Sequence, residues 1–270
     1  MPRVRHAFMG RQGGTSPAPW NSLNVSYTVG DVASRVDENR ARALHAFAAR
    51  AEGPLFPEPL IRLETSREAT DMGTREDEIP LYTAKQVHGT GLLVIESGMD
   101  PNSVRGREAD AVATRARGVF VGVQTADCGP VLLAASDGSV VCAVHAGWRG
   151  AAAGIVQQTV RRLCERFEIE PGKLVAAVGP CIGPEAFEVR QDVLDAFAGQ
   201  HRDCFARQGF EHWLFNLPRW LALTLNACGV TRVETLDVCT YGNPDMCFSY
   251  RRARHKGRST GCQLSVIGIC

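Results

Sequence analysis

The 270-residue sequence has no long apolar run and almost no net charge. A membrane-spanning helix needs about 18 consecutive apolar residues, and no segment approaches that length. Thirty lysines and arginines are balanced by 29 aspartates and glutamates, which leaves a formal net charge of +1. This balance excludes the broad positive field of a dedicated nucleic-acid binder, so any anion site must be local. We therefore expect neither a nucleic-acid partner nor membrane association.

The N-terminal segment also lacks the features of a secretory signal, because Arg3, Arg5, His6 and Arg11 interrupt its apolar residues. This favours a cytoplasmic protein whose ten cysteines are reduced thiols. Most free cysteines pack as small apolar residues, so only one or two are expected to serve a metal or catalytic role.

Strand and helix signals alternate along the chain, and no internal repeat interrupts them. This pattern predicts an α/β fold in which residues 1–270 form a single layered domain, with a mixed β-sheet flanked by helices. Strands are expected at 92–95, 118–124, 131–135, 139–144 and 174–178. Helices are expected after Ser34, which would cap the first, and as one continuous amphipathic segment over 148–167. The polar stretch 64–80 is expected to be an exposed loop.

A two-residue turn at Asp137-Gly138 predicts a β-hairpin that brings a thiol and an imidazole together. In that register Cys128 lies opposite Gly147, and His145 becomes its diagonal neighbour on the same face. Two features could prevent Cys128 and His145 from meeting in this way. Pro130 would place Cys128 on the incoming loop if it ended the ladder, and a three-residue turn would change which face His145 occupies.

A converging cysteine and histidine have three interpretations. The two side chains lie together by chance in a cysteine-rich core, they form a thiolate–imidazolium nucleophile, or they are half of a metal site. Thiolate and imidazole ligands suit zinc, and a catalytic zinc needs a third protein ligand and one open position. His88, in a turn before an apolar strand, is the candidate third ligand, although a lone histidine there is more often a polar loop residue.

Three motifs resemble those of a known family: Gln86-Val87-His88-Gly89, Ala126-Asp127-Cys128, and His145-Ala146-Gly147-Trp148-Arg149-Gly150. They are similar in order and spacing to the signatures of the purine nucleoside phosphorylase family formerly described as laccase-domain or polyphenol oxidase proteins. Further similar segments are 22–24, 29–31, 38–40, 109–111, 179–189, 239–240 and 248–252. The resemblance runs from about residue 10 to the C-terminus.

This resemblance implies one zinc ion per chain, bound by His88, Cys128 and His145. It also implies a cytoplasmic enzyme that uses phosphate to cleave adenosine, inosine, guanosine or methylthioadenosine into base and ribose 1-phosphate, and that deaminates adenosine. Zinc would lower the pKa of a bound water for the deamination. No protein partner can be inferred.

Five other residues in these segments are expected to have roles at the site. Arg149, at the start of the 148–167 helix, would bind phosphate and take part in catalysis, because free backbone amides there already favour an anion. Asp127 would be a catalytic partner of the metal site or a proton acceptor, unless it only caps a strand end. Asn24 and Arg251 would bind substrate or phosphate. Trp148 would stack on a base or, more commonly for such a residue, pack the helix onto the sheet.

The sequence departs from the family pattern at two positions near these motifs. Cys262 follows Gly261 where relatives usually carry an arginine, and Gly129 replaces a larger apolar residue. The basic cluster formed by Arg251, Arg252, Arg254, His255, Lys256 and Arg258 has two interpretations, an anion site or a solvated surface.

Four other functions are considered. A multicopper laccase is disfavoured, because seven histidines with one plausible cluster cannot supply four coppers. A hydrolase that edits peptidoglycan precursors would use the same zinc site. A metal-free Cys–His amidohydrolase would keep its activity under chelation. In a scaffold with structural zinc, a fourth protein ligand would close the site.

Overall fold

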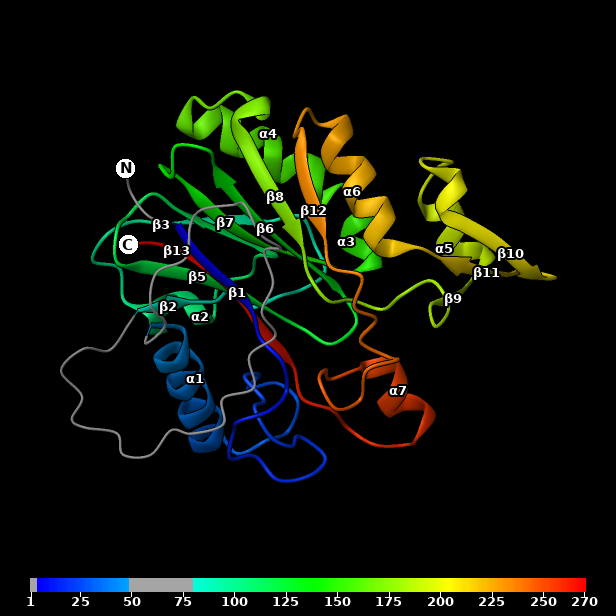
Figure 1. Cartoon of the computed structure of the whole chain (residues 1–270), viewed down its shortest axis with the longest axis horizontal. Helices are drawn as coiled ribbons and strands as arrows, with labels where there is room; N and C mark the ends of the chain where they lie inside the picture. The colour runs from blue at the N-terminus through cyan, green and yellow to red at the C-terminus, as the bar shows by residue number, and fades with distance from the viewer. Residues whose placement is uncertain (1–3, 49–79) are drawn as a thin grey trace.

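Two β-sheets stack on one another in the computed structural model, which describes residues 4–48 and 80–270, and helices cover their outer faces (Figure 1). This arrangement confirms the predicted α/β class with mixed sheets and flanking helices. The strands form three sheets instead of one, because a second sheet covers the inner face of the largest and a small third sheet lies to the side.

The largest sheet has six strands in the order β12-β8-β6-β7-β4-β3. Its outer pairs, β12 with β8 and β4 with β3, are parallel, and the three central pairs are antiparallel. The strands are β3 (Leu92–Ile95), β4 (Ala111–Thr114), β6 (Gly129–Ala135), β7 (Val141–Ala146), β8 (Leu174–Val178) and β12 (Arg232–Thr235). Every residue of the four central strands is buried, as expected for a sheet covered on both faces.

The second sheet packs against one face of the first and has the order β1-β13-β5-β2. Its strands are β1 (Val4–Phe8), β2 (Leu81–Tyr82), β5 (Val119–Thr125) and β13 (Gln263–Ile269). Val121 and Ile267 meet Leu132 and Val141 in the core between the two sheets. Alternate residues of the same strands, such as Leu264, face outward beneath a helix.

Helices close both outer faces. α4 (Ile155–Phe167) and α6 (Leu217–Ala227) cover the six-stranded sheet, and α1 (Ala33–Ala48) covers the four-stranded one (Figure 1). The shorter helices are α2 (Pro101–Arg105), α3 (Trp148–Ala152), α5 (Gln191–Ala196) and α7 (Tyr250–His255), with two 3₁₀ turns, η1 (Pro171–Lys173) and η2 (Arg202–Cys204). A three-stranded sheet beside α5 comprises β9 (Glu188–Arg190), β10 (Phe205–Gly209) and β11 (His212–Phe215).

The predicted hairpin register is confirmed. Gly129 pairs with Ala146 and Ala134 with Val141, which is the predicted register. The turn itself is wider than the predicted two residues, because the last ladder bond joins Ala135 to Val140, and the Ser136 amide bonds Lys173 instead of Ser139. Pro130 does not end the ladder, since it stays paired with His145, and Cys128 directly precedes the strand. The five predicted strands are all present, with bounds shifted by two residues at most.

The prediction of one continuous helix over 148–167 is wrong. α3 ends at Ala152 and α4 begins at Ile155, because Gly154 between them is left-handed, with φ of +85°. A left-handed residue cannot continue a right-handed helix, and glycine adopts that conformation at little cost. α1 begins at Ala33, one residue before the predicted cap at Ser34. Of the predicted loop 64–80, all but Pro80 lies outside the described residues.

Within residues 4–48 and 80–270, no helix combines the length and apolar character needed to span a membrane.

Candidate metal centre

The side chains of His88, Cys128 and His145 converge so that their candidate ligand atoms all lie within 4.8 Å of one another. Cys128 Sγ lies 3.8 Å from His88 Nε2, and the two imidazole ring centroids are 4.8 Å apart. His145 belongs to β7, Cys128 precedes β6, and His88 lies in the loop before β3. The residues singled out from the sequence thus meet at one edge of the six-stranded sheet.

A single buried carboxylate holds both histidines in place. Asp110 Oδ1 accepts a hydrogen bond from the His88 amide at 2.9 Å and lies 2.8 Å from His145 Nδ1. Asp110 Oδ2 accepts from the amides of Val87 and Gly89. These bonds fix the His88 loop, in which His88 itself has a left-handed φ of +60°. Because Nδ1 of His145 is occupied by Asp110, Nε2 is the nitrogen available to a metal.

Gly147 leaves the space that the three ligands occupy. A Cβ atom at this position would lie 2.9 Å from Cys128 Sγ and 2.8 Å from His88 Cδ2, both closer than real Cβ contacts. Any side chain there would displace two of the three ligands. The glycine of the third motif is therefore required by the geometry of the cluster.

Charge at the cluster favours a thiolate beside an imidazolium when no metal is bound. Burial raises the pKa of Cys128. The neighbouring His145 and His88 lower it by more than burial raises it, so the pKa lies below its usual range. Burial lowers the pKa of His145, but Cys128 and Asp110 raise it, and the net pKa is above the usual range. Burial also raises the pKa of Asp110, and the hydrogen bonds from His145 and Gly89 more than offset this. A deprotonated thiolate is the form that ligates metals.

One thiolate and two imidazoles match the donor set of a catalytic zinc site. No fourth histidine, cysteine, aspartate or glutamate joins this cluster among the described residues. A tetrahedral ion would therefore keep one position open for water or substrate. A closed structural site, in which a fourth protein ligand completes the coordination, does not fit this donor set.

Both carboxylate oxygens of Asp127 are hydrogen-bonded within the protein. Its Oδ1 accepts a hydrogen bond from Thr240 Oγ1, and its Oδ2 accepts from the Arg251 amide, both at 2.6 Å. Asp127 has a φ of +90° and is buried. The carboxylate next to the metal cysteine thus ties α7 and the 239–240 segment to the centre.

Arg251 and Asn24 are both engaged within the protein. The Arg251 guanidinium donates to the carbonyls of Ala186 and Glu188. Asn24 is fully buried, and its amide bonds Ser26, Asp31 and the Cys262 backbone. Through that last bond Asn24 fixes the backbone of Cys262.

Arg149 is exposed at the start of α3, two residues after Gly147, and its guanidinium lies 4.5 Å from the Trp148 ring centroid. Within the described part of the chain, no ion pair involves it. Trp148 is partly buried against the core beneath the helices, which agrees with a packing role. α3 has only five residues, so its N-terminus offers little helix dipole, and the Arg149 guanidinium is the main positive charge at this position.

Gly129 has a local explanation. A Cβ atom there would lie 2.4 Å from Leu221 Cδ1, so the α6 side chain occupies the space that a larger residue would need.

Asp110 is the functional residue that the sequence did not single out, although it lies in one of the similar segments. Its role depends on β4 pairing with β7, which sets Ala111 opposite Val144 and so puts Asp110 beside His145. No local turn predicts that pairing. The available signal was an acidic residue directly before the apolar run Ala111-Val112-Ala113, because a carboxylate there is costly to bury unless it is bonded.

The chain is similar to one family model and to several named relatives over most of its length. Residues 5–58 and 61–270 match the family model described as multi-copper polyphenol oxidoreductase laccase. The purine nucleoside phosphorylase of Pseudomonas aeruginosa is 35% identical over 262 residues, which cover 95% of this chain and 91% of the relative. The purine nucleoside phosphorylase of Haemophilus influenzae is 32% identical over 264 residues, covering 96% and 93%.

Solved structures share the fold. The hypothetical protein YfiH of Bacillus licheniformis superposes with a TM-score of 0.82 at 26% identity, covering 98% of this chain and 92% of that protein. YlmD of Geobacillus stearothermophilus gives a TM-score of 0.81 at 26% identity, covering 98% and 91%.

Proposed function

This chain belongs to the family described as multi-copper polyphenol oxidoreductase laccase, and from that membership, its phosphorylase-named relatives and its metal centre we propose that it is a zinc-dependent purine nucleoside phosphorylase. We propose adenosine, inosine, guanosine and methylthioadenosine as substrates, with deamination of adenosine as a second activity. The observation that carries the proposal is the open cluster of His88, Cys128 and His145, with Arg149 close by along the chain.

The family's description names several coppers, and the residues do not fit such a set. All seven histidines and ten cysteines fall within the described residues, where His88, Cys128 and His145 form one candidate cluster. A laccase needs four coppers and many more histidine ligands. No step of laccase chemistry is therefore assigned to this chain.

Zinc at this centre would act as a Lewis acid toward a substrate oxygen and would activate water for deamination. The chain's own residues contribute position and charge. Asp110 orients His145 and the His88 loop, so that the ligands stay in place without a substrate. Arg149 would hold phosphate through two guanidinium N–H groups, a geometry that lysine cannot reproduce.

In phosphorolysis a phosphate oxygen bonds to C1′ of the ribose as the bond from C1′ to the base nitrogen breaks. The base leaves with the bonding electron pair and takes up a proton, and the sugar leaves as ribose 1-phosphate, or as 5-methylthioribose 1-phosphate when the substrate is methylthioadenosine. Arg149 would orient the phosphate and offset its charge during the attack. Asp127 would act on this chemistry through the groups it holds, Thr240 and the Arg251 backbone.

The test is base release from the four nucleosides with and without phosphate, with the products separated by chromatography. We expect purine release to require phosphate, to yield ribose 1-phosphate and to accept arsenate in place of phosphate. Deamination of adenosine should proceed without phosphate. Free ribose formed at equal rates with and without phosphate would mean a hydrolase.

Two further results would replace the proposal. If no nucleoside releases its base, the hydrolase that edits peptidoglycan precursors becomes the better assignment. If activity survives complete removal of the metal by a chelator, the metal-free Cys–His amidohydrolase becomes the better assignment.

A further inference from the structure

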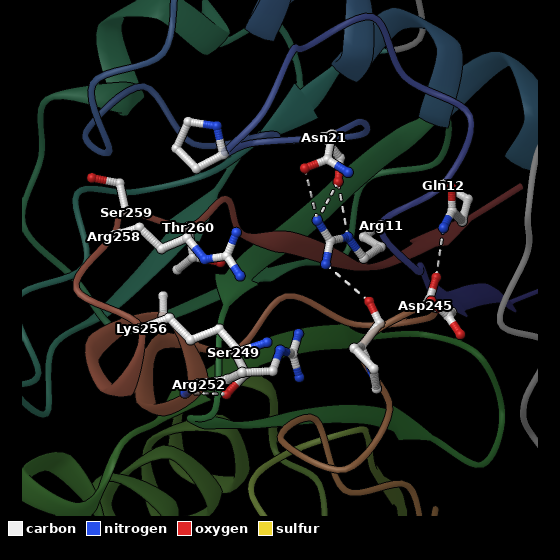
Figure 2. A pocket seen from close by; sticks show the side chains of 13 residues that line it. Arg11, Gln12, Asn21, Asp245, Ser249, Arg252, Lys256, Arg258, Ser259 and Thr260 are labelled. Carbon is white, nitrogen blue, oxygen red and sulfur yellow. Dashed lines mark hydrogen bonds between the residues drawn. The ribbon is translucent and has the colours of Figure 1, made fainter.

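A polar pocket of about 270 Å³ is lined by residues other than those of the metal cluster (Figure 2). It is formed by residues 11–21, the segment 244–253 and the turn after α7. None of His88, Cys128 and His145 lines it. Its volume approaches the lower end of the range for small-molecule sites, about 300 Å³. We call it the basic pocket.

α7 separates the basic pocket from the metal centre. The backbone of Arg251 bonds Asp127 next to the metal cysteine, and its guanidinium reaches the carbonyls of residues 186 and 188. Ser249, Arg252, Ala253 and Lys256 recur at the three- and four-residue spacing of one helix face and line the pocket. Of the basic residues clustered in the sequence, Arg251 therefore contacts the metal centre through Asp127, whereas Arg252, Lys256 and Arg258 line the basic pocket.

Four cationic side chains surround the basic pocket: Arg11, Arg252, Lys256 and Arg258. Figure 2 shows them gathered around one space. Asp245 is the one carboxylate in its lining. Within the described residues, none of the four cations forms an ion pair. The pocket therefore holds a net charge of about three positive units that no carboxylate of the protein neutralises directly.

Two of these cations are held in place by backbone carbonyls. Arg11 donates to the Asn21 carbonyl at 2.8 Å and to the Pro244 carbonyl at 2.9 Å. Arg252 donates to the carbonyls of Thr240, Tyr241 and Cys247. Burial, followed by the positive charge of Arg252, lowers the pKa of Arg11, which agrees with like charges fixed near one another. Their positions are set before any ligand arrives, which reduces the entropy lost on binding.

The other two cations, Lys256 and Arg258, are exposed. Lys256 and Arg258 follow α7, where their backbone amides bond the Ala253 carbonyl, and their side chains make no hydrogen bond with another described residue. The hydroxyl groups of Ser249, Ser259 and Thr260 lie in the same lining. Fixed guanidinium groups at the back, with free cations and hydroxyl donors at the rim, are the elements of a site for a multiply charged anion.

We propose that the basic pocket binds a small molecule that carries a diphosphate group, at a site distinct from the metal centre. A single phosphate, with at most two negative charges, would leave part of the pocket's charge unbalanced, whereas a diphosphate carries about three. An RNA or DNA strand is disfavoured because the chain has a net charge of only +1 and its basic residues gather in one pocket instead of a surface track. This proposal does not depend on the reaction assigned to the metal centre.

The test is isothermal titration of the zinc-loaded protein with inorganic pyrophosphate and with inorganic phosphate. We expect pyrophosphate to bind at least about tenfold more tightly than phosphate. The Lys256→Ala/Arg258→Ala double variant should weaken pyrophosphate binding at least about tenfold, because two charge-assisted contacts are lost. Arg254→Ala, an exposed charge on the same helix that does not line the pocket, should change it less than about twofold.

A second arm separates the two sites, because pyrophosphate also coordinates zinc. Cys128→Ala, which removes a metal ligand, should keep pyrophosphate binding unchanged if the basic pocket is responsible. Three results would overturn the proposal: loss of binding in Cys128→Ala, equal affinity in the Lys256/Arg258 double variant and the wild type, or tighter binding of an RNA oligonucleotide than of pyrophosphate. Titration with ADP then shows whether a nucleoside attached to the diphosphate adds affinity.

Discussion

The Asp110 carboxylate and the His145 imidazole lie 2.8 Å apart, and both side chains are almost completely buried. The same carboxylate also accepts the backbone amides of the loop that contains His88. One acidic residue therefore determines the orientation of two of the three candidate metal ligands.

Asp110→Asn should weaken zinc binding by roughly 10- to 100-fold, the usual effect of losing a partner behind a ligating histidine. An amide can still occupy the space, but it cannot accept all four hydrogen bonds, and its NH₂ group faces donors. Zinc affinity measured by competition with a chromogenic chelator checks this. Asp195→Asn, an exposed carboxylate on α5, is the matched control. Equal zinc affinity in the Asp110 and Asp195 variants would show that Asp110 does not position the ligands.

Cys128→Ala should lose most of the bound zinc, because only the two imidazoles of the three-residue cluster remain. Elemental analysis of the purified protein measures this directly. Cys239→Ala and Cys270→Ala should retain about one zinc per chain, since neither residue belongs to the cluster. Full zinc occupancy in the Cys128 variant would contradict the ligand assignment.

Gly147→Ala should reduce both zinc content and nucleoside cleavage, because the new methyl group would lie within 3 Å of Cys128 and His88 atoms. Gly106→Ala is the control, since a Cβ atom there meets nothing within 4 Å and φ is −84°. Zinc content and circular dichroism should be compared for both variants. A Gly147→Ala protein with normal zinc content would show that the cluster tolerates a wider spacing.

Arg149→Lys should impair phosphorolysis more than deamination, because a lysine keeps the charge but loses the paired N–H groups that hold phosphate. We expect the phosphate concentration for half-maximal rate to rise about tenfold or more, as for loss of one charge-assisted contact. Arg161→Lys, on the exposed face of α4, is the control. If phosphate dependence is unchanged in Arg149→Lys, phosphate binds elsewhere.

Gly154→Ala should destabilise the protein by about 1 to 2 kcal/mol, since a left-handed conformation is unfavourable for any residue with a Cβ atom. Denaturant unfolding measures the change, with Gly106→Ala again as the control. An increase in stability would show that α3 and α4 can merge into one helix.

The sequence predicts local geometry here better than long-range pairing. The Asp137-Gly138 turn is a local signal, and it correctly predicts which residues of β6 and β7 face one another. His88 lies in a loop far from the hairpin along the chain, so its turn made it only a candidate third ligand, and the family resemblance implied that role. Asp110 was missed for the same reason, because β4 and β7 are separated by two other strands along the chain.

The helix break shows a different limit. Apolar residues continue at helical spacing on both sides of Gly154, so hydrophobic periodicity predicts one helix where there are two. Periodicity records which face is buried, and it is insensitive to the handedness of a single residue.

The hairpin register also makes a distant turn a determinant of the metal chemistry. The side chains of a strand alternate between its two faces, so a one-residue slip exchanges the faces completely. A single residue inserted between Ser136 and Ser139, at the far end of the hairpin, would shift β7 against β6. His145 would then turn toward the other side of the sheet, away from Cys128. The length of this surface turn is thus tied to the convergence of the His88, Cys128 and His145 side chains at the opposite end of the hairpin.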